Sequence, residues 1–574
     1  MMTVLIQDAL AQPVFDALTI QLENSADGDP AELAREALET AVSQVLGTSA
    51  VNWQIKPVHK SVPDAFDLIP PADQAILVQQ GFQLKYRLEE QDNIAYADVL
   101  FETNLDDIPE DTSLEVDTGA LAGPGENWWN NLTVTEQDPM WSLRLIEADK
   151  AWNDSRGANI VVGHPDSGYI PHPELDDTRI LHAFERDIYE GDANAQNPAQ
   201  RGGNHGLSTA SVILSGQSKL SPTHFVIGVA PEAEIVPMRI TKKGPPVFFS
   251  RSGPRRVRDA IYHAIDSNCH VISMSLGGLG DRSLRQAIQE AVRQNIIVLA
   301  AAGNVVRIVV WPARYPEAIA VAACTADRKR WFHSSRGPTV DVTAPGHNVW
   351  RAYINENGNL DARPSSGTSY AVATAAGVAV LWLAFHGRDN LLQKYQDVPL
   401  QEVFRKVLTE SCDPPPEDHH GQFGSGIING RSVLEAALPP EDEISQDILD
   451  GSLAAGPEQE KGAGKIAVAF DTVSTDDVRA GLSEMWEQLP EDELDTRLEG
   501  VEDELLFHII TNPGLRNAFV SVEEAPPAIG DDFVLDGPLM DADAKAISKS
   551  LHEQLLAVPG LSNSLRQRIA GQRP

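Results

Sequence analysis

Four polar residues whose types can do acid–base and nucleophilic chemistry stand at the ends of apolar segments. Asp166 closes "IVVGHPD", His205 precedes "LSTASVIL", Asn304 follows "VLAAAG", and Ser369 precedes "YAVATAAG". Taken singly, each of these residue types is common as a turn former or a helix cap. Together they supply an acid, a base, an amide donor and a hydroxyl. Nucleophilic hydrolysis with a stabilised oxyanion needs this set of groups.

The segments that must position these residues alternate between strand and helix patterns. Strands are expected within residues 158–164, 233–240, 270–276, 296–303 and 318–323, and helices within 257–268 and 282–295. Alternation of this kind predicts an α/β fold in which a parallel β-sheet carries helices on both faces. Functional groups of such sheets gather where strands end and helices begin. The four residues are therefore expected to lie close together in the folded domain.

The order of the reactive residues along the chain is informative. Asp166, His205 and Ser369 follow one another in an order that differs from Ser–Asp–His in α/β-hydrolases and His–Asp–Ser in chymotrypsin-like proteases. The surrounding residues resemble the subtilisin-like serine peptidases, the subtilase family. The resemblance runs over residues 151–437 and includes "HPEL", "GVAPEAEIVPMRI", "VISMSLGG", "SSRGPTVDVTAPG" and "GTSYAVATAAG".

This resemblance implies a serine endopeptidase that works through an acyl-enzyme. Ser369 Oγ would attack the scissile carbonyl, His205 would act as base and then acid, and Asp166 would orient His205. The side-chain amide of Asn304 and the backbone N–H of Ser369 would hold the oxyanion.

Substrate binding is also implied by the resemblance. An extended peptide would pair with the strand "SLGG", and the first specificity pocket would lie beside "AAG", with Val310 near its floor. The substrate-binding residues are then Ser275, Leu276, Gly277, Gly278, Ala302 and Gly303. These segments contain no carboxylate, which predicts a broad or apolar P1 preference. Gly206 and Gly367 are expected to let the backbone approach the substrate closely.

Three positions depart from the family pattern. Leu207 replaces the threonine usual after the catalytic His-Gly, Ala373 replaces a proline, and Pro165 directly precedes the acid. None removes a reacting group. An alternative function is therefore kept, in which a catalytically quiet subtilase fold serves as a binding or scaffold protein. The complete set of four reactive residues favours the enzyme.

Composition shifts divide the chain into five parts. We expect a small α+β domain over 1–103, an acidic linker over 104–139, the catalytic domain over 140–438, a second acidic linker over 439–464, and a mostly helical module without assigned chemistry over 465–574. Within the first domain, strands are expected over 50–58, 82–88 and 94–103, and a helix over 29–47.

The last expected strand of this domain, "IAYADVLFE", resembles the end of inhibitory propeptide domains. The resemblance implies intramolecular inhibition, with cleavage in the 104–140 region. An unrelated partner-binding domain is the open alternative.

The overall composition limits the classes of binding partner that we expect. A formal net charge of −38 disfavours binding to nucleic acid or to anionic membrane surfaces. The longest apolar run, 370–385, is shorter than the roughly 20 residues of a spanning helix and predicts a buried core helix. The N-terminus shows no basic and apolar signal pattern, which favours a cytoplasmic location and leaves export by another route open.

Cysteines and carboxylates do not indicate a metal or a cofactor. The three cysteines are widely spaced and are expected to be buried free thiols: Cys269, Cys324 and Cys412. The family resemblance makes calcium possible, but its ligands are not identified. Glu174 in "HPEL" falls near one ligand position of the family and is expected to be an ordinary surface carboxylate.

Overall fold

The computed structural model describes the greater part of the 574-residue chain. The described residues are 14–23, 28–102, 135–197, 205–216, 220, 224–241, 247–248, 253–278, 280–304, 309–355, 358–415, 422–444, 498, 500–511, 555–556, 558 and 560–569. They belong to two compact units. Unit 1 combines residues 1–103 with 455–574, and unit 2 comprises residues 104–454. The linkers expected at 104–139 and 439–464 lie largely outside the described residues, so the predicted domain boundaries stay predictions.

Unit 2 is built on a seven-stranded parallel sheet. In spatial order the strands are β13 (Val342–Pro345), β12 (Ile319–Cys324), β11 (Ile297–Ala301), β9 (Val271–Met274), β5 (Val161–Asp166), β7 (Glu234–Arg239) and β6 (Arg186–Asp187). Most of these strands are buried along their whole length, because helices cover both faces of a parallel sheet. All five strands predicted for this domain form, and the predicted α/β fold class is confirmed.

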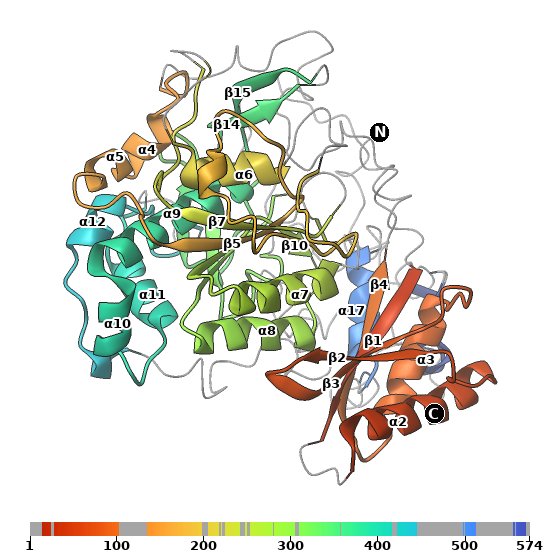
Figure 1. The fold of residues 1–574 in the computed structure, drawn as a ribbon. Coiled ribbons are helices and arrows are strands. Elements are labelled where there is room, and N and C mark those ends of the chain that lie inside the picture. The colour runs from red at the N-terminus through yellow and green to blue at the C-terminus, as the bar shows by residue number, and fades with distance from the viewer. Residues whose placement is uncertain are drawn as a thin grey trace, which may run out of the picture. The chain divides into compact units, whose positions relative to one another are not determined.

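The covering helices lie in two layers (Figure 1). One layer holds α7 (Gly253–Asp266) and α8 (Arg282–Arg293), and the other holds α6 (His205–Leu214) and α9 (Thr368–His386). The remaining elements of unit 2 are α4 (Trp141–Leu145), α5 (Ala148–Ala151), η5 (Asp177–Arg179), β8 (Val247–Phe248), β10 (Gly277–Gly278), β14 (Val349–Ile354), β15 (Leu360–Ser365), α10 (Arg388–Lys394), α11 (Leu400–Glu410), α12 (Gly430–Glu435) and η6 (Glu441–Glu443).

The predicted core helix is α9. Its length and hydropathy would suit a membrane span, but 89% of its most apolar window is buried inside the protein. Small residues let it approach its neighbours closely: a Cβ on Gly377 would stand 2.4 Å from the Cβ of Val229. The helix therefore forms the centre of the core of unit 2, with α6 and four strands of the sheet packed around it.

Unit 1 contains a four-stranded antiparallel sheet in the order β2-β3-β1-β4. The strands are β1 (Val14–Leu22), β2 (Gln54–His59), β3 (Val62–Ile69) and β4 (Ile94–Glu102). Helix α2 (Pro30–Leu46) begins at the Asp29 cap, whose side chain accepts from the N–H of Ala31, and ends at Gly47 in the left-handed region with φ 65°. It matches the predicted helix.

Residues 82–88 were expected to form a strand, and this prediction is wrong. They belong to helix α3 (Val78–Glu89). "FQLKYRL" alternates apolar and polar residues, but the buried residues of α3 recur three and four positions apart, as in a helix: Gly81, Phe82, Leu84, Lys85 and Leu88. Packing against α2, β1 and β4 selected the helix.

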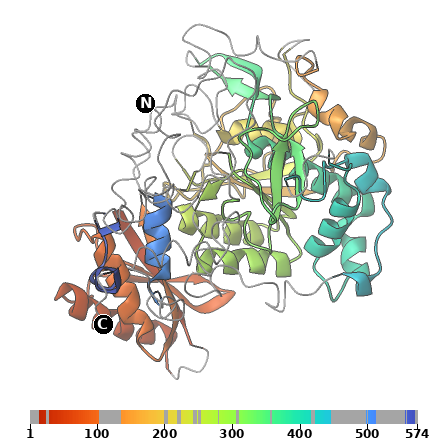
Figure 2. The ribbon, with the colours of Figure 1, turned by 180° about the vertical axis from the view of Figure 1, so that it is seen from behind.

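The C-terminal part of the chain packs on α3 inside unit 1. Figures 1 and 2 show α17 (Glu502–Thr511) in blue beside the N-terminal sheet and helices. The rings of Phe82 and Phe507 lie 5.5 Å apart, and the hydroxyl of Tyr86 donates to Glu504 Oε2 at 2.8 Å. The mostly helical module predicted over 465–574 contains α17 and a further helix, α20 (Asn563–Ile569). Most of the other residues of this module lie outside the described part of the chain.

Candidate functional site

The four predicted reactive residues all stand at the ends of elements of unit 2. Asp166 is the last residue of β5 and His205 is the first residue of α6. Ser369 is the second residue of α9, and Asn304 lies three residues beyond the end of β11. The topology of the parallel sheet thus delivers acid, base, amide and hydroxyl from four separate segments.

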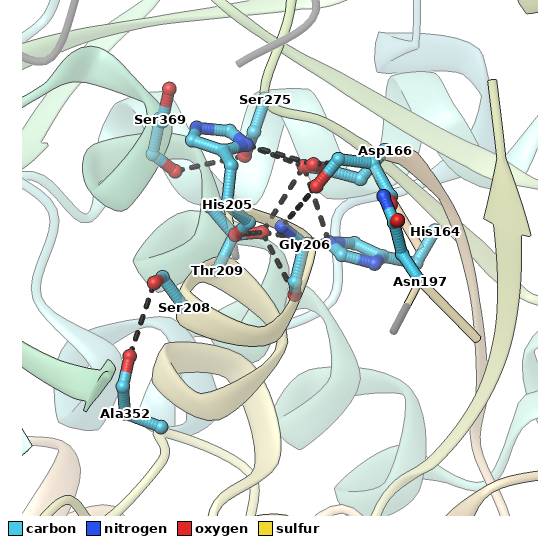
Figure 3. Close-up of polar contacts among 11 residues, drawn as sticks. His164, Asp166, Asn197, His205, Gly206, Ser208, Thr209, Ser275, Ala352 and Ser369 are labelled. Carbon is cyan, nitrogen blue, oxygen red and sulfur yellow. Dashed lines mark hydrogen bonds and ion pairs between the residues drawn. The ribbon is translucent and has the colours of Figure 1, made fainter. Parts of the chain in front are cut away.

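The buried carboxylate of Asp166 holds the imidazole of His205. Nδ1 of His205 lies 2.8 Å from Oδ1 and 3.0 Å from Oδ2 of Asp166. A ring nitrogen so close to a carboxylate carries the proton, which leaves Nε2 as the basic atom of the neutral ring. Figure 3 shows the His205 ring between Asp166 and Ser369. The imidazole is therefore oriented to accept a proton from the Ser369 side.

A close backbone contact between Gly206 and Gly168 brings the segments that carry His205 and Asp166 together. A Cβ on Gly206 would stand 2.0 Å from the carbonyl oxygen of Gly168, in the turn that follows Asp166. The N–H of Gly206 also donates to Ser167 Oγ at 2.9 Å. The expectation for Gly206 is corrected: its missing side chain admits the protein's own Gly168 carbonyl. Around Gly367 a Cβ would meet its nearest atom, Asn304 Nδ2, at an ordinary 3.5 Å, so no described neighbour excludes a side chain there.

Asp166 is charged in spite of its complete burial. Burial by itself raises the pKa of this carboxyl, but the charge and hydrogen bond of His205, the nearby His164 and the N–H of Ser167 together lower the pKa below its usual value. Ser167 N–H donates to Asp166 Oδ1 at 2.6 Å. Asp166 is therefore available as a carboxylate to stabilise a protonated His205.

Asn304 is oriented by the residue that precedes Ser369. Its Oδ1 accepts from the backbone N–H of Thr368 at 2.8 Å and from the Thr368 hydroxyl at 2.7 Å. These two donors identify Oδ1 and place Nδ2 on the other side of the amide. The same helix start carries the backbone N–H of Ser369. Amide and backbone donors thus converge at the N-terminus of α9, where the helix dipole favours negative charge.

The backbone of Ser369 is held by a side chain from another segment. Its carbonyl oxygen accepts from the hydroxyl of Ser275 at 3.0 Å, and the residue as a whole is 7% exposed. Ser275 was predicted as part of the peptide-binding strand. In the structure its hydroxyl also contacts the backbone of Ser369, which ties the position of Ser369 to that segment.

The predicted peptide-binding strand is short and has neighbours on both edges. Gly277 and Gly278 form β10, which pairs in parallel with β8. On its other edge, Gly278 exchanges backbone hydrogen bonds with Trp311 at 2.8 and 3.2 Å. A peptide that pairs with the edge of β10 now occupied by β8 would therefore have to displace β8.

The predicted pocket residues surround Val310. A Cβ on Gly277 would stand 2.3 Å from Cγ2 of Val310, and a Cβ on Gly303 would stand 3.2 Å from the same methyl group. The N–H of Val310 donates to the carbonyl of Ala302 at 3.0 Å. The isopropyl group thus fills the space between the two glycine-containing segments. Leu276, the remaining predicted residue, is buried.

Sequence reasoning missed three polar residues of this site: His164, Thr209 and Thr368. Spacing offered a signal for two of them. His164 lies two residues before Asp166 on a strand, and Thr209 lies four residues after His205 on a helix, so each shares a face with a reactive residue. Thr368 had no such signal, because its contact with Asn304 joins residues 64 positions apart.

The prediction for Glu174 is wrong. Its side chain is buried, and it accepts from the hydroxyl of Ser215 at 3.3 Å. Among the described residues, no group of three His, Cys, Asp or Glu side chains lies close enough to hold a metal ion. Glu174 therefore contributes to a buried hydrogen-bonded corner of the fold. Among the cysteines, Cys269 and Cys324 are buried as expected, and Cys412 is half-buried.

Comparisons with known proteins agree with this geometry. Residues 157–426 match the sequence model of the subtilase family. The chain is 32% identical over 264 residues to thermitase of Thermoactinomyces vulgaris, covering 44% of this chain and 87% of thermitase. It is 28% identical over 304 residues to subtilisin DY of Bacillus licheniformis, covering 51% of this chain and 98% of that protein.

A solved structure matches the fold. Fervidolysin from Fervidobacterium pennivorans, described as a keratinolytic enzyme related to subtilisin, superposes with a TM-score of 0.53 at 19% identity. The match covers 74% of this chain and 62% of fervidolysin.

Proposed function

Because the chain belongs to the subtilase family and is a subtilisin-like serine protease, we propose that Asp166, His205 and Ser369 form its catalytic triad. The observation that carries this assignment is the hydrogen bond of 2.8 Å between His205 Nδ1 and Asp166 Oδ1, in a ring that faces Ser369 (Figure 3). The substrates are peptide bonds of proteins or peptides.

The reaction proceeds through an acyl-enzyme. His205 Nε2 takes the proton of Ser369 Oγ as this oxygen attacks the scissile carbonyl, and then delivers the proton to the leaving amine. A water molecule, deprotonated by the same nitrogen, releases the acyl group. Throughout, the Asp166 carboxylate stabilises the imidazolium that forms at each proton transfer.

The oxyanion of each tetrahedral intermediate lies at the N-terminus of α9. Asn304 Nδ2 and the backbone N–H of Ser369 are its donors, and the contacts of Thr368 with Asn304 Oδ1 support this role because they orient the amide before the substrate binds. Because such donors already point to the oxyanion position, the protein does not have to rearrange them when the negative charge develops.

The specificity pocket accepts small apolar P1 side chains. Val310 occupies the space between Gly277 and Gly303, so a large aromatic side chain would collide with its methyl groups. No carboxylate is present among the predicted pocket residues to pair with a basic side chain. This narrows the apolar preference expected from sequence to alanine-sized side chains.

The N-terminal domain acts as an intramolecular inhibitor. Its antiparallel sheet ends with β4, which leads directly into the acidic segment over 104–139 where cleavage would separate the domain. An inhibitor joined to the enzyme by one chain has a high effective concentration until that connection is cut.

A fluorophosphonate probe tests the triad. We expect it to label the wild-type chain and not the Ser369→Ala variant, with His205→Ala labelled far more slowly. The probe is applied to the full chain and again after cleavage at a site engineered into the 104–139 segment. Intact-mass measurement shows whether wild-type protein is cut there spontaneously. Absence of labelling in both forms would overturn the proposed function.

A further inference from the structure

A second polar pair, His164 and Thr209, lies next to Asp166, with His164 on the side away from Ser369 and Thr209 below the His205 ring (Figure 3). His164 belongs to β5 and is 2% exposed, and Thr209 belongs to α6 and is fully buried. Neither residue is among the four that the proposed triad and oxyanion site use. Buried polar groups cost free energy unless they are hydrogen-bonded, so their partners decide what they do here.

These partners are each other and the catalytic carboxylate. His164 Nε2 lies 2.9 Å from Thr209 Oγ1, and Thr209 Oγ1 lies 3.2 Å from Asp166 Oδ2. His164 Nε2 is 3.8 Å from the same carboxylate oxygen. The three side chains thus form a chain that ends on Oδ2, while His205 and Ser167 N–H make their shorter contacts with Oδ1.

Thr209 has a single hydroxyl proton to donate. The acceptor of this proton determines which groups donate and which accept along this series of hydrogen bonds. Besides Asp166, its possible acceptors are His164 Nε2 and the backbone carbonyls of His205 at 3.1 Å and Gly206 at 3.4 Å. If His164 Nε2 accepts this proton, Oδ2 of the buried carboxylate loses a donor. If His164 Nε2 carries the ring proton and donates it to Thr209, the hydroxyl proton can point to Oδ2. A carboxylate is the strongest acceptor of the set, which favours the second arrangement.

We propose that His164 and Thr209 are positioning residues of the protease, in which His164 Nε2–H donates to Thr209 and the Thr209 hydroxyl donates to Asp166 Oδ2. This contact fixes the rotation of the carboxylate, so that Oδ1 stays aligned with His205 Nδ1. The inference rests on the proposed triad. The neutral form of His164 suits the role, since burial lowers its pKa more strongly than the nearby Asp166 raises it.

Loss of the Thr209 hydroxyl would leave Asp166 Oδ2 without the contact that fixes the rotation of the carboxylate, while His205 Nδ1 stays within reach of both oxygens. Because a hydrogen bond to a charged group is worth more than a neutral one, we expect kcat to fall by about 10- to 100-fold in Thr209→Val. The Michaelis constant should stay unchanged, since neither residue touches the substrate. His164→Leu should produce a smaller loss in kcat, because the hydroxyl remains but is no longer oriented.

The test compares matched variants of the full chain on a chromogenic peptide. Thr209→Ser and His164→Gln retain a donor at each position and should recover most of the lost kcat. Thr374→Val is the control for removing a buried helical hydroxyl, because Thr374 Oγ1 donates to the carbonyl of Tyr370 at 2.8 Å in α9. Thr374→Val should keep the wild-type kcat.

A spectroscopic readout separates positioning from general damage. The low-field proton resonance of His205 Nδ1–H reports the hydrogen bond to Asp166. It should move or broaden in Thr209→Val and His164→Leu, and return in Thr209→Ser and His164→Gln. Wild-type kcat in both Thr209→Val and His164→Leu would overturn the inference. So would a loss of kcat that leaves this resonance in place, or one that the donor-retaining variants do not recover.

Two further variants distinguish failure of the inference from failure of the proposed function. Asp166→Asn and Ser369→Ala are measured in the same assay. If both hydrolyse the peptide at the wild-type rate, the triad itself is wrong. If both abolish hydrolysis while Thr209→Val does not change it, only the positioning role fails.

Discussion

The side-chain oxygen of Asn304 accepts two hydrogen bonds from Thr368, the residue directly before Ser369. The backbone N–H donates at 2.8 Å and the hydroxyl at 2.7 Å. The orientation of the Asn304 amide, the proposed oxyanion donor, and the position of Ser369, the proposed nucleophile, are therefore set by the same turn of chain at the start of α9.

Replacing Asn304 by leucine should lower kcat by about 100- to 1,000-fold with little change in KM, because one preorganised oxyanion donor is lost. Thr368→Val keeps the backbone donor and removes the hydroxyl, and should cost about 10-fold in kcat. Steady-state kinetics on one peptide checks both variants, and Thr368→Ser serves as the control that retains the hydroxyl. Equal kcat for wild type and Asn304→Leu would contradict the assigned oxyanion site.

Replacing Val310 by glycine should change specificity. The removed isopropyl group fills the space beside Gly277 and Gly303, so the variant should accept a phenylalanine at P1. We expect the ratio of kcat/KM for phenylalanine over alanine at P1 to rise by at least about 10-fold, in the range that pocket-filling groups contribute. Val310→Ala should fall between the two proteins. An unchanged ratio in Val310→Gly would show that another residue limits the pocket.

His172 should make unit 2 less stable in mild acid. Its Nδ1 accepts from the N–H of Glu174 at 3.1 Å and its Nε2 faces the carbonyl of Tyr353 at 3.2 Å, an arrangement that suits the neutral ring. Burial lowers the pKa of His172 from 6.5 to about 4, against smaller opposing effects of its hydrogen bonds. Between these pH values the unfolded chain binds a proton that the folded chain does not, so stability falls as the pH is lowered.

Urea unfolding at pH 7 and pH 5 measures this effect. The Ser369→Ala background prevents self-digestion, and tryptophan fluorescence follows the transition. The free energy of unfolding should drop by about 2 kcal/mol more in this background than in the same protein carrying His172→Gln, whose side chain does not titrate. Identical pH dependence in the two proteins would rule out a buried neutral His172.

The buried carboxylate of Glu504 should stabilise the contact between the C-terminal helices and α3. It accepts from the hydroxyl of Tyr86 at 2.8 Å and from the N–H and hydroxyl of Ser562, each at 2.5 Å. Tyr86→Phe removes one donor and should weaken protection of the α17 amides by about 1–2 kcal/mol in hydrogen exchange. Arg87→Ala, which removes the exposed ion pair of this α3 residue with Glu90 just beyond the helix end, should change this protection by less than about 0.5 kcal/mol.

Several parts of the fold were predictable because their signals are local. The β-branched runs from 158–164 to 318–323 identify strands of the parallel sheet, and the Asp29 and Gly47 caps bound α2. The strand prediction for residues 82–88 was wrong for the opposite reason, because the signal that decides their structure is not local. Their alternation fits a strand, and only packing against the neighbouring sheet and α2 shows that the segment is helical.

The sequence by itself determined the reactive residue types, their order Asp166, His205, Ser369, and their places at strand ends and helix starts, because these features are written in local pattern and spacing. Tertiary structure alone decided the rest. Three features depend on contacts between separate segments of the chain: the burial of Glu174 beside Ser215, the packing of Val310 against Gly277, and the hydrogen bonds of Asn304 with Thr368. Such contacts depend on how the sheet and its helices close around one another, and no local pattern encodes them.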